Sequence, residues 1–413
     1  MEEPIPKERE GSGSVARAKG EKQLLVESGH PSACDRVLAA FRGDDPGGVI
    51  WQPRLEYWYE ANRRLGTLPE PLTDASLIDV YDYCGASVRY FTLPLQQRHR
   101  RVEVTREWES DRRLRITWRT PQGALTELRQ YDVFKLSWHN LEWQVEQPED
   151  FAILEAVLED EEWVWDQDAY EEDLDRVGER GCPQFFFRRS PIQSLFIDRM
   201  GYEPAIHALY EEPGLIRRYV RASVKADDAL YEALCQSPVP ILNLGENIDA
   251  ALNPPPIWHE HLAPYYARRI DQLHEAGKIV HIHVDGSMRA LLPHLRACAW
   301  DGLEAATPQP QGDVSLEEIK QLVGEDRVLL DGIPALYFLP DLYPVEELVD
   351  CVRRIVQLFY PRVILGISDE LPPDADIGRV RLVGRLVADM VQGPGQGRHF
   401  KRTLAKTDAN GCP

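Results

Sequence analysis

KIVHIHVDG, residues 278–286, is the stretch of sequence that best indicates the fold of this chain. Its β-branched residues alternate with polar ones, which predicts a buried strand. Because side chains on a strand alternate between two faces, His281, His283 and Asp285 are expected to point the same way. Gly286 follows and lets the chain turn. The end of this strand is therefore a candidate metal or catalytic site, with two hydrogen-bonded core histidines as the alternative.

The sequence on both sides of this stretch repeats one pattern, in which short apolar runs alternate with helical segments. Further strands are predicted at residues 184–187, 239–244, 302–305, 328–330 and 363–367. Strands that take turns with helices favour a parallel sheet. Six to eight such units fit between residue 149 and the end of the last predicted helix, which predicts an α/β fold, a (β/α)₈ TIM barrel. No glycine-rich nucleotide-binding motif follows a predicted strand.

The N-terminal part of the chain departs from this pattern. Helices are predicted at residues 31–41, within 49–65 after Pro53, and at 76–84. Residues 101–145 alternate between apolar and polar side chains, which predicts an antiparallel β insert. We therefore predict one barrel domain over residues 31–392 that carries this insert. The polar tails, residues 1–30 and 393–413, are predicted to be disordered.

Composition narrows the class of protein further. The 413 residues include 43% hydrophobic ones, and the net charge is −21, which disfavours binding to nucleic acid or to an anionic membrane. The sequence shows no signal peptide and no long apolar run, so no membrane span is expected. Seven cysteines without a C-x-x-C motif predict a reduced, cytoplasmic protein in which each thiol is a small buried side chain. Oligomeric state is left open.

Catalytic groups of a (β/α)₈ barrel lie at the carboxyl ends of its strands. The polar residues that end the predicted strands are Glu246, Asn247, His281, His283, Asp285, Glu304, Asp331, Ser368, Asp369 and Glu370. Asp and Ser at such positions also serve as helix caps, whereas Glu is a poorer cap, which shifts Glu246 and Glu304 toward function. A divalent metal such as zinc would need a third ligand beside the two histidines, from Glu246, Asp369 or Asp285. Without a metal, the same groups could transfer protons.

Several stretches, taken together, resemble the uroporphyrinogen decarboxylase-like superfamily of (β/α)₈ barrels, and more narrowly its cobalamin-linked methyltransferase and demethylase branch. The resemblance covers roughly residues 35–392 and depends on the order and spacing of the stretches. They are residues 51–59, 66–69, 120–125, 245–249, 277–286, 331–335, 366–369 and 371–373. The arginine-rich signature by which the decarboxylases hold a tetrapyrrole is missing at residues 50–54.

The resemblance implies a metal site and a corrinoid methyl carrier. Methyltransferases of this branch typically hold zinc through a His-x-Cys pair and a later Cys. His281 matches the first ligand, but His283 replaces the cysteine, and Ser368 and Asp369 stand near the later position. A site of nitrogen and oxygen ligands is harder than one with thiolates, so a metal other than zinc is also possible here.

The sequence thus predicts a metal-dependent methyltransferase that moves a methyl group between a small methylated substrate and a corrinoid, with a corrinoid protein as a possible partner. A decarboxylase or lyase acting on a small carboxylate and a non-catalytic binding barrel are the alternatives. The expected roles are metal binding by His281, His283 and Glu246, catalysis by Asp285, Asp369 and Glu304, and substrate binding by Trp58, Asn247 and Tyr337.

Overall fold

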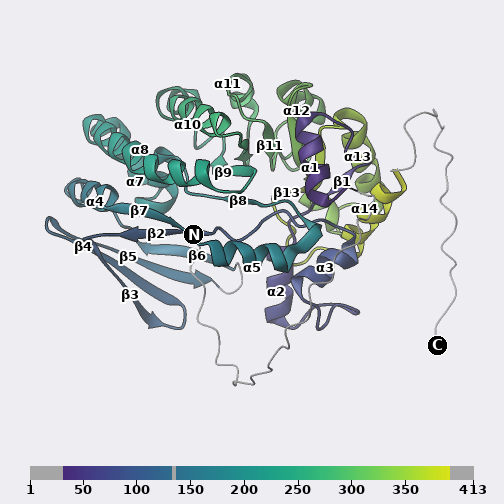
Figure 1. Cartoon of the computed structure of the whole chain (residues 1–413), viewed down its shortest axis with the longest axis horizontal. Helices are drawn as coiled ribbons and strands as arrows, with labels where there is room; N and C mark the ends of the chain where they lie inside the picture. Colours follow the sequence, from purple (N-terminus) through teal and green to yellow (C-terminus); the bar gives the residue numbers. More distant parts are fainter. Residues whose placement is uncertain (1–30, 133–135, 391–413) are drawn as a thin grey trace.

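The computed structural model describes residues 31–132 and 136–390, and the two predicted tails lie outside these residues. Seven parallel strands form the central sheet, in the order β1-β13-β12-β11-β10-β9-β8. Figure 1 shows the sheet curled, with helices along its outer side. The strands are β1 (Ile50–Trp51), β8 (Gln184–Phe186), β9 (Ile241–Ile248), β10 (Ile279–Val284), β11 (Gly302–Glu304), β12 (Val328–Pro334) and β13 (Val363–Ser368).

An irregular segment, residues 86–91, closes the ring between β1 and β8. The amide of Ser87 donates to Trp51 O at 2.9 Å, and the amide of Phe91 donates to Gln184 O at 3.0 Å. Val88 forms a parallel bridge with Gly181, just before β8. The segment therefore stands where the eighth strand of a (β/α)₈ barrel belongs. This arrangement confirms the predicted fold class.

The helices that follow the strands cover the outside of the barrel (Figure 1). Each turns its apolar side inward, as α13 shows with buried Leu348, Val352, Ile355 and Phe359 at intervals of three or four residues. The helix after β11 begins at the predicted capping box of Ser315 and Glu318. These helices are α8 (Pro213–Gln236), α10 (Ala263–Glu275), α11 (Leu292–Ala297), α12 (Leu316–Val323), α13 (Val345–Phe359) and α14 (Ile377–Met390).

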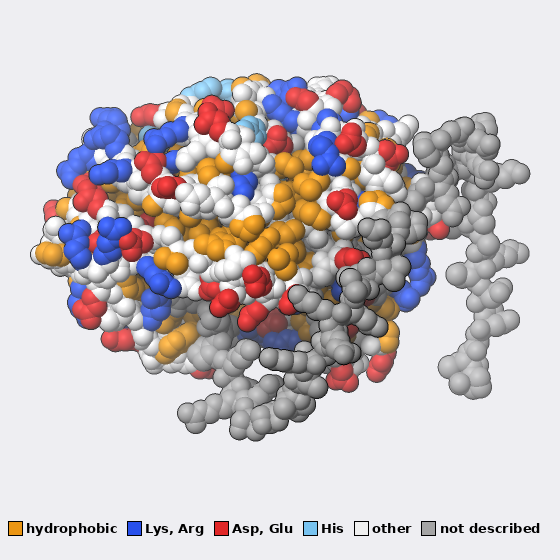
Figure 2. Space-filling view, viewed as in Figure 1, with side chains coloured by type: hydrophobic (Ala, Val, Ile, Leu, Met, Phe, Trp, Pro, Cys, Tyr) orange, Lys and Arg blue, Asp and Glu red, His pale blue; other side chains and the backbone are white. Residues whose placement is uncertain are grey.

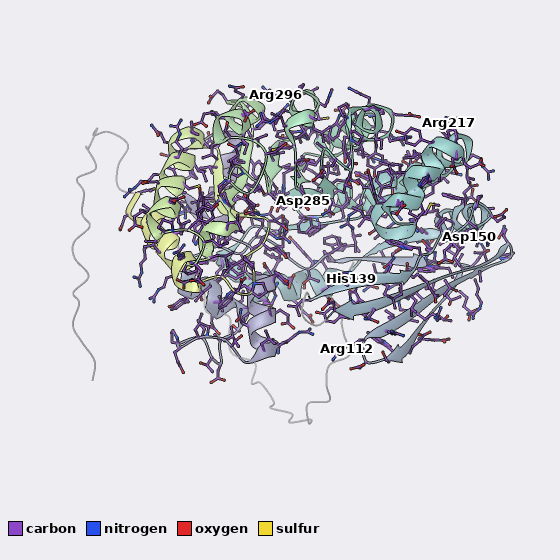
Figure 3. The ribbon with its side chains drawn as sticks, turned by 180° about the vertical axis from the view of Figure 1, so that it is seen from behind. Arg112, His139, Asp150, Arg217, Asp285 and Arg296 are labelled. Carbon is purple, nitrogen blue, oxygen red and sulfur yellow. A yellow bond between two sulfur atoms is a disulfide. The ribbon has the colours of Figure 1, made fainter. Side chains whose placement is uncertain are left out.

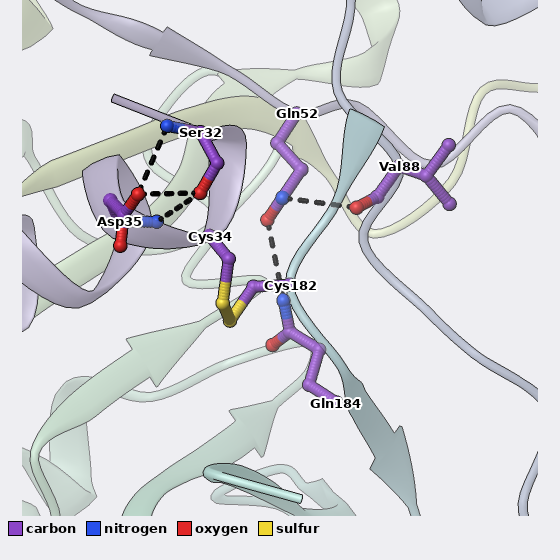
Figure 4. The surroundings of a disulfide bond; sticks show 7 residues. All are labelled: Ser32, Cys34, Asp35, Gln52, Val88, Cys182 and Gln184. Atoms are coloured by element: carbon purple, nitrogen blue, oxygen red, sulfur yellow. Dashed lines mark hydrogen bonds between the residues drawn. A yellow bond between two sulfur atoms is a disulfide. The ribbon is translucent and has the colours of Figure 1, made fainter. Parts of the chain in front are cut away.

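Helix α1 (Ala33–Arg42) lies against the amino ends of the strands. Its Val37, Ala40 and Phe41 belong to one apolar cluster with residues that begin β9, β12 and β13. Figure 2, viewed as in Figure 1, shows apolar side chains in a band across the middle of the molecule. A disulfide joins Cys34 of α1 to Cys182 (Figure 4). The prediction that every cysteine is a free buried thiol is therefore wrong for these two residues.

The predicted insert is confirmed as a four-stranded antiparallel sheet, β3-β4-β5-β6. Figure 3 shows it to one side of the molecule, with Arg112 and His139 on it and Asp285 near the centre of the view. Its strands are β3 (Glu103–Ser110), β4 (Arg113–Thr120), β5 (Gly123–Asp132) and β6 (Ser137–Glu142), and a separate antiparallel pair consists of β2 (Leu95–His99) and β7 (Glu161–Trp165). Ile153 of α4 (Asp150–Glu159) lies directly over Gly123, so α4 supports the sheet.

The remaining elements connect these parts. The helix predicted after Pro53 is confirmed and begins at Glu56, while residues 50–51 before it form β1. The connecting helices are α2 (Glu56–Leu65), α3 (Leu77–Cys84), α5 (Gln167–Val177), α6 (Pro191–Ser194), α7 (Tyr202–Glu211) and α9 (Pro255–Ile257), with single turns at Leu195–Arg199, Trp258–Leu262, Arg289–Leu291 and Ala335–Phe338. Within the described part of the chain, none of the helices has the length and apolarity that crossing a membrane requires.

Candidate active site

The barrel interior contains a histidine–carboxylate pair near the carboxyl ends of its strands. His283 of β10 and Glu304 of β11 are register partners on neighbouring strands. His283 Nδ1 lies 2.5 Å from Glu304 Oε2, and both side chains are buried. Since side chains of paired residues share one face of a sheet, the register itself brings these two groups together.

Four groups surround the Glu304 carboxylate. Tyr90 donates its hydroxyl proton to Glu304 Oε1 at 2.8 Å, and Asn243 Nδ2 donates to Oε2 at 3.2 Å. Arg89 Nη1 lies 3.4 Å from Oε1, and His283 completes the set. Every neighbour is a donor or a cation, so the surroundings stabilise the ionised form of Glu304.

Arg89 links this pair to the next strand. Its guanidinium contacts both carboxylate oxygens of Asp331, at 2.7 and 2.8 Å, and donates to the carbonyl oxygen of Gln52 at 2.8 Å. All three side chains are fully buried. A Cβ at Gly366 would lie 2.1 Å from Asp331 Oδ1, so glycine on β13 leaves the space that this ion pair occupies. The arrangement fixes Arg89 beside Glu304.

The pair has the electrostatics of an imidazolium and a carboxylate. Burial alone would lower the pKa of His283, but the charge of Glu304 and the hydrogen bond to it raise this pKa above the ordinary value of 6.5. Burial would raise the pKa of Glu304, and the charge of His283, their hydrogen bond and the two nearby arginines lower it well below 4.5. The contact with Glu304 thus favours the protonated form of His283.

The second imidazole nitrogen of His283 faces the rim of the barrel. His283 Nε2 lies 4.0 Å from Asp369 Oδ1, and the Asp369 side chain is 47% exposed. Asp369 also accepts a hydrogen bond from Arg54 at 2.7 Å, and Glu370 pairs with the same guanidinium at 2.5 Å. The Arg54 guanidinium lies over the ring of Phe186, 5.3 Å from its centroid. A group that enters the mouth of the barrel would meet Nε2, Asp369 and Arg54 together.

Backbone strain gathers at the same end of the barrel. Ala305, Asp331 and Asp369 have φ values of 61°, 78° and 64°, and they belong to three successive strands or their ends. Left-handed conformations are unfavourable for residues other than glycine and concentrate at functional sites. The strained residues thus lie at the same end of the barrel as the His283–Glu304 pair, which supports this end as the candidate site.

His281 lies two residues before His283 and has a different environment. Its Nε2 contacts Gln184 Oε1 at 3.0 Å, and its ring lies 6.4 Å from that of Phe41 on α1. Gln184 in turn donates to Gln52 Oε1 at 3.5 Å, a contact drawn in Figure 4. Burial lowers the pKa of His281 to about 3, so this histidine is neutral. It therefore corresponds to the core-histidine alternative.

Glu246 points away from the barrel interior. It lies in the part of β9 where the pairing with β10 is irregular, and Ser190 and Tyr266 of α10 are among the groups that shift its pKa. One oxygen of Glu246 accepts the amide of Ser190 at 2.8 Å, while the other has no partner in the described structure. Burial raises the pKa of Glu246 to about 7. Glu246 is thus packed between the barrel wall and its helices.

The other predicted site residues are spread around the rim. Asn247 accepts hydrogen bonds from Arg189 and contacts Asp285 at 3.4 Å, while Asp285 also accepts the amide of Gly286. Trp58 is buried in α2 and donates to the carbonyl of Ala375 at 3.0 Å. The ring of Tyr337 packs against that of Tyr343. None of these contacts involves His283 or Glu304.

The predicted metal ligands do not fit a shared ion. His281, His283 and Glu246 each contact a different protein group, namely Gln184, Glu304 and the Ser190 amide. Over residues 31–132 and 136–390, no three His, Cys, Asp or Glu side chains are grouped so that they could hold a metal. His281, His283 and Asp285 were expected to point the same way, and each of them contacts a different partner, namely Gln184, Glu304 and Asn247. The site is therefore described by its acid–base groups.

Comparison with solved structures finds several proteins that align with this chain. The chain aligns with a methyltransferase from Methanosarcina mazei at a TM-score of 0.55 and 13% identity, over 87% of this chain and 98% of that one. A B12-independent methionine synthase from Shewanella sp. W3-18-1 matches at 0.34 and 10% identity, over 83% and 96%. A GH53 catalytic domain from Ignisphaera aggregans matches at 0.35 and 11% identity, over 83% and 97%. The first likeness shows a shared barrel fold.

Comparison by sequence adds no family to this result. No protein-family model matches the chain, and no curated protein matches it. The class of protein is therefore defined by the barrel and by the buried His283–Glu304 pair.

Three site residues escaped the sequence analysis: Arg89, Tyr90 and Asn243. Arg89 and Tyr90 belong to the segment that closes the barrel, which pairs through isolated hydrogen bonds and has no regular strand. Its sequence, SVRYF at residues 87–91, follows Gly85 and mixes β-branched and aromatic residues, which could have suggested a short strand. Asn243 lies within a predicted strand, where an isolated polar residue on the inner face was the available signal.

Proposed function

We propose that this protein is a methyl-transferring barrel enzyme for a small substrate, in which protonated His283 is the general acid. The single observation that supports this role is the 2.5 Å contact between His283 and Glu304 at the carboxyl end of the barrel strands. The shared fold with a methanogen methyltransferase supports the reaction class. In this proposal, Asp369 at the rim orients the substrate or relays the proton.

The reaction would proceed by loss of a methyl group from an oxygen or sulfur atom of the donor. The bond between methyl and heteroatom breaks, and an acceptor nucleophile supplies the electron pair for the new bond to carbon. The proton on His283 Nε2 passes to the heteroatom, so that the demethylated product leaves neutral. Glu304 stabilises the imidazolium before this step and fixes which nitrogen faces the substrate. His283 then regains a proton from solvent through the exposed side of Asp369.

The acceptor in this proposal is a corrinoid, free or carried by a corrinoid protein. When bound, a reduced corrinoid would supply a strong nucleophile for the methyl group. The described residues show no arrangement that selects a corrinoid, and they do not group around a metal, so no step above is assigned to either. The family resemblance implies the corrinoid, and the assay below therefore includes one.

The test is an assay of methyl transfer with the full chain. A panel of methoxylated aromatic compounds and small methyl thioethers is mixed with cob(I)alamin, and methylcobalamin is followed by its absorbance spectrum. We expect His283→Gln to lower the rate about 100-fold or more, because a general acid contributes roughly that much. His207→Gln, on the exposed face of α7, is the control and should keep the full rate. Equal rates for His283→Gln and the wild type would contradict the proposal.

A decarboxylase or lyase acting on a small carboxylate is the second candidate. It is favoured by two arginines at the mouth: Arg54 follows β1, and Arg189 follows β8 and contacts Asn247 at 2.8 Å. A substrate carboxylate would replace Asp369 and Glu370 on Arg54, or Asp198 on Arg189, and His283 would protonate the carbanion left by CO₂. Release of CO₂ from a carboxylate panel without any corrinoid would favour this candidate. Stabilisation by such ligands without turnover would instead indicate a binding barrel.

A further inference from the structure

A cavity outside the barrel is lined by residues of α14 and of the neighbouring α3 and α13. Figure 1 shows where these three helices lie. Its volume is about 500 Å³, within the range of small-molecule pockets. Its lining includes Tyr83, Val345, Asp376, Arg379, Arg381 and Arg385. Three of these six side chains are cationic and one is acidic, although the chain as a whole has a net charge of −21. The cavity is thus a local concentration of positive charge.

Arg381 and Arg385 differ from Arg379, which donates hydrogen bonds to backbone carbonyls. Among the residues that the structure describes, Arg381 and Arg385 form no ion pair, whereas Arg353 on the neighbouring helix pairs with Asp350 at 3.4 Å. Arg381 and Arg385 are one helical turn apart, so they project from the same side of α14. The Arg381 guanidinium is held over the ring of Tyr83, 4.2 Å from its centroid. One cation is therefore held in place, and the other is exposed beside it.

The other two charged groups in the lining have structural partners. Arg379 donates to the carbonyls of Tyr337 and Tyr343 at 2.6 and 2.8 Å, which fixes the wall of the cavity. Asp376 accepts the amide of Gly378 at 2.7 Å and so caps the start of α14. Because Arg379 and Asp376 already bind backbone groups, Arg381 and Arg385 are the charged groups of the lining that a ligand can bind.

We propose that this cavity binds a small molecule that carries a phosphate ester. Two guanidinium groups one turn apart match a doubly charged oxyanion, since each can donate two hydrogen bonds to phosphate oxygens. The cavity is larger than a phosphate ion needs, so its remaining volume accommodates the body of the ester. The site is separate from the His283–Glu304 pair, so the proposal stands or falls independently of the methyl-transfer reaction.

The test is isothermal titration calorimetry of the full chain with AMP, ribose 5-phosphate and inorganic phosphate at low salt. We expect saturable binding of at least one ester, competition by inorganic phosphate, and weakening as NaCl is raised. Arg385→Gln, an exposed position, should weaken binding about tenfold or more, and Arg381→Gln with Arg385→Gln should abolish it. Arg353→Gln removes the same charge from α13 and should leave the affinity unchanged.

Two outcomes would overturn the proposal. One is the absence of saturable binding by the wild type with all three probes. The other is affinity for an ester that Arg385→Gln leaves intact, because the anion would then be bound elsewhere. Thermal unfolding of each variant without ligand shows whether it is folded, and Arg385→Gln alone decides the question if the double variant is not.

Discussion

His281 and His283 lie two residues apart on β10, point into the same barrel, and have opposite properties. His281 contacts the neutral amide of Gln184, and burial lowers its pKa to about 3. His283 contacts the carboxylate of Glu304, and its pKa lies above the ordinary value. Burial disfavours the charged form of both rings, so the difference comes from the partner on the neighbouring strand. The partner of each buried histidine therefore decides in which direction its pKa is shifted.

The two glutamates of the barrel wall show the same contrast. Glu304 faces inward among donors and cations, and its pKa is lowered, whereas Glu246 faces the helices, and burial raises its pKa to about 7. Both were predicted as site residues because both stand at strand ends. The pKa of a glutamate in the barrel wall therefore depends on the side that it faces. Inside the barrel, donors and cations lower the pKa, and on the outer side burial raises it.

The largest effect on stability is expected from Glu304→Gln. This substitution leaves His283 and Arg89 without the negative charge between them, which should cost about 3 kcal/mol or more. The pKa of His283 should then fall, because the charge and the hydrogen bond of Glu304 are the largest influences that raise it. Urea unfolding at pH 7 measures the loss. Glu317→Gln breaks the exposed pair with Arg354 and should cost at most about 1 kcal/mol. Equal losses would show that Glu304 carries no special charge interaction.

His281→Gln should change how stability depends on pH. The folded pKa of His281 is about 3 and the ordinary value is 6.5, so between these values the unfolded chain binds the proton and the folded chain does not. Each pH unit below 6.5 therefore costs the wild type up to about 1.4 kcal/mol, and the variant should lack this slope. Urea unfolding from pH 7 to pH 4 gives both curves. Parallel curves would mean that His281 is protonated in the folded protein.

Glu246→Gln should act over a narrower pH range than His281→Gln and with the opposite sign. Its folded pKa of about 7 exceeds the ordinary 4.5, so the unfolded chain loses this proton first as pH rises. The wild type loses stability between pH 4.5 and pH 7, and the variant should not. Because the glutamine oxygen can still accept the Ser190 amide, the packing is kept. A variant less stable than the wild type at pH 8 would contradict this account.

The sequence predicts the barrel well because its strands are buried on both sides and read as apolar runs. β8 to β13 all fall where such runs were found. The sequence did not predict β1 or the segment of residues 86–91, because a two-residue strand and an irregular segment show no periodic pattern. The antiparallel insert was evident from strict alternation over β3 to β5. Local pattern therefore identified the barrel but not how it closes.

The candidate site was predictable only in part. Alternation placed His283 at a strand end, and the poor capping ability of Glu304 marked it as a site residue. That these two residues touch depends on the register of β10 against β11, which spacing along the chain does not encode. Arg89 and Tyr90 come from a segment some 200 residues earlier, and only folding brings them to Glu304. The three predicted metal ligands, His281, His283 and Glu246, likewise contact three different partners.

The pKa of His283 tests the central claim most directly. It can be measured by NMR from the pH dependence of the imidazole Cε1–H resonance, with His283→Gln used to assign the signal. The account predicts a pKa above 6.5 in the wild type, so that the stability this pair contributes is present below pH 6.5 and is lost as pH rises through the folded pKa. In Glu304→Gln the pKa should fall below 6.5. A wild-type pKa at or below 6.5, or one that Glu304→Gln leaves unchanged, would contradict the account.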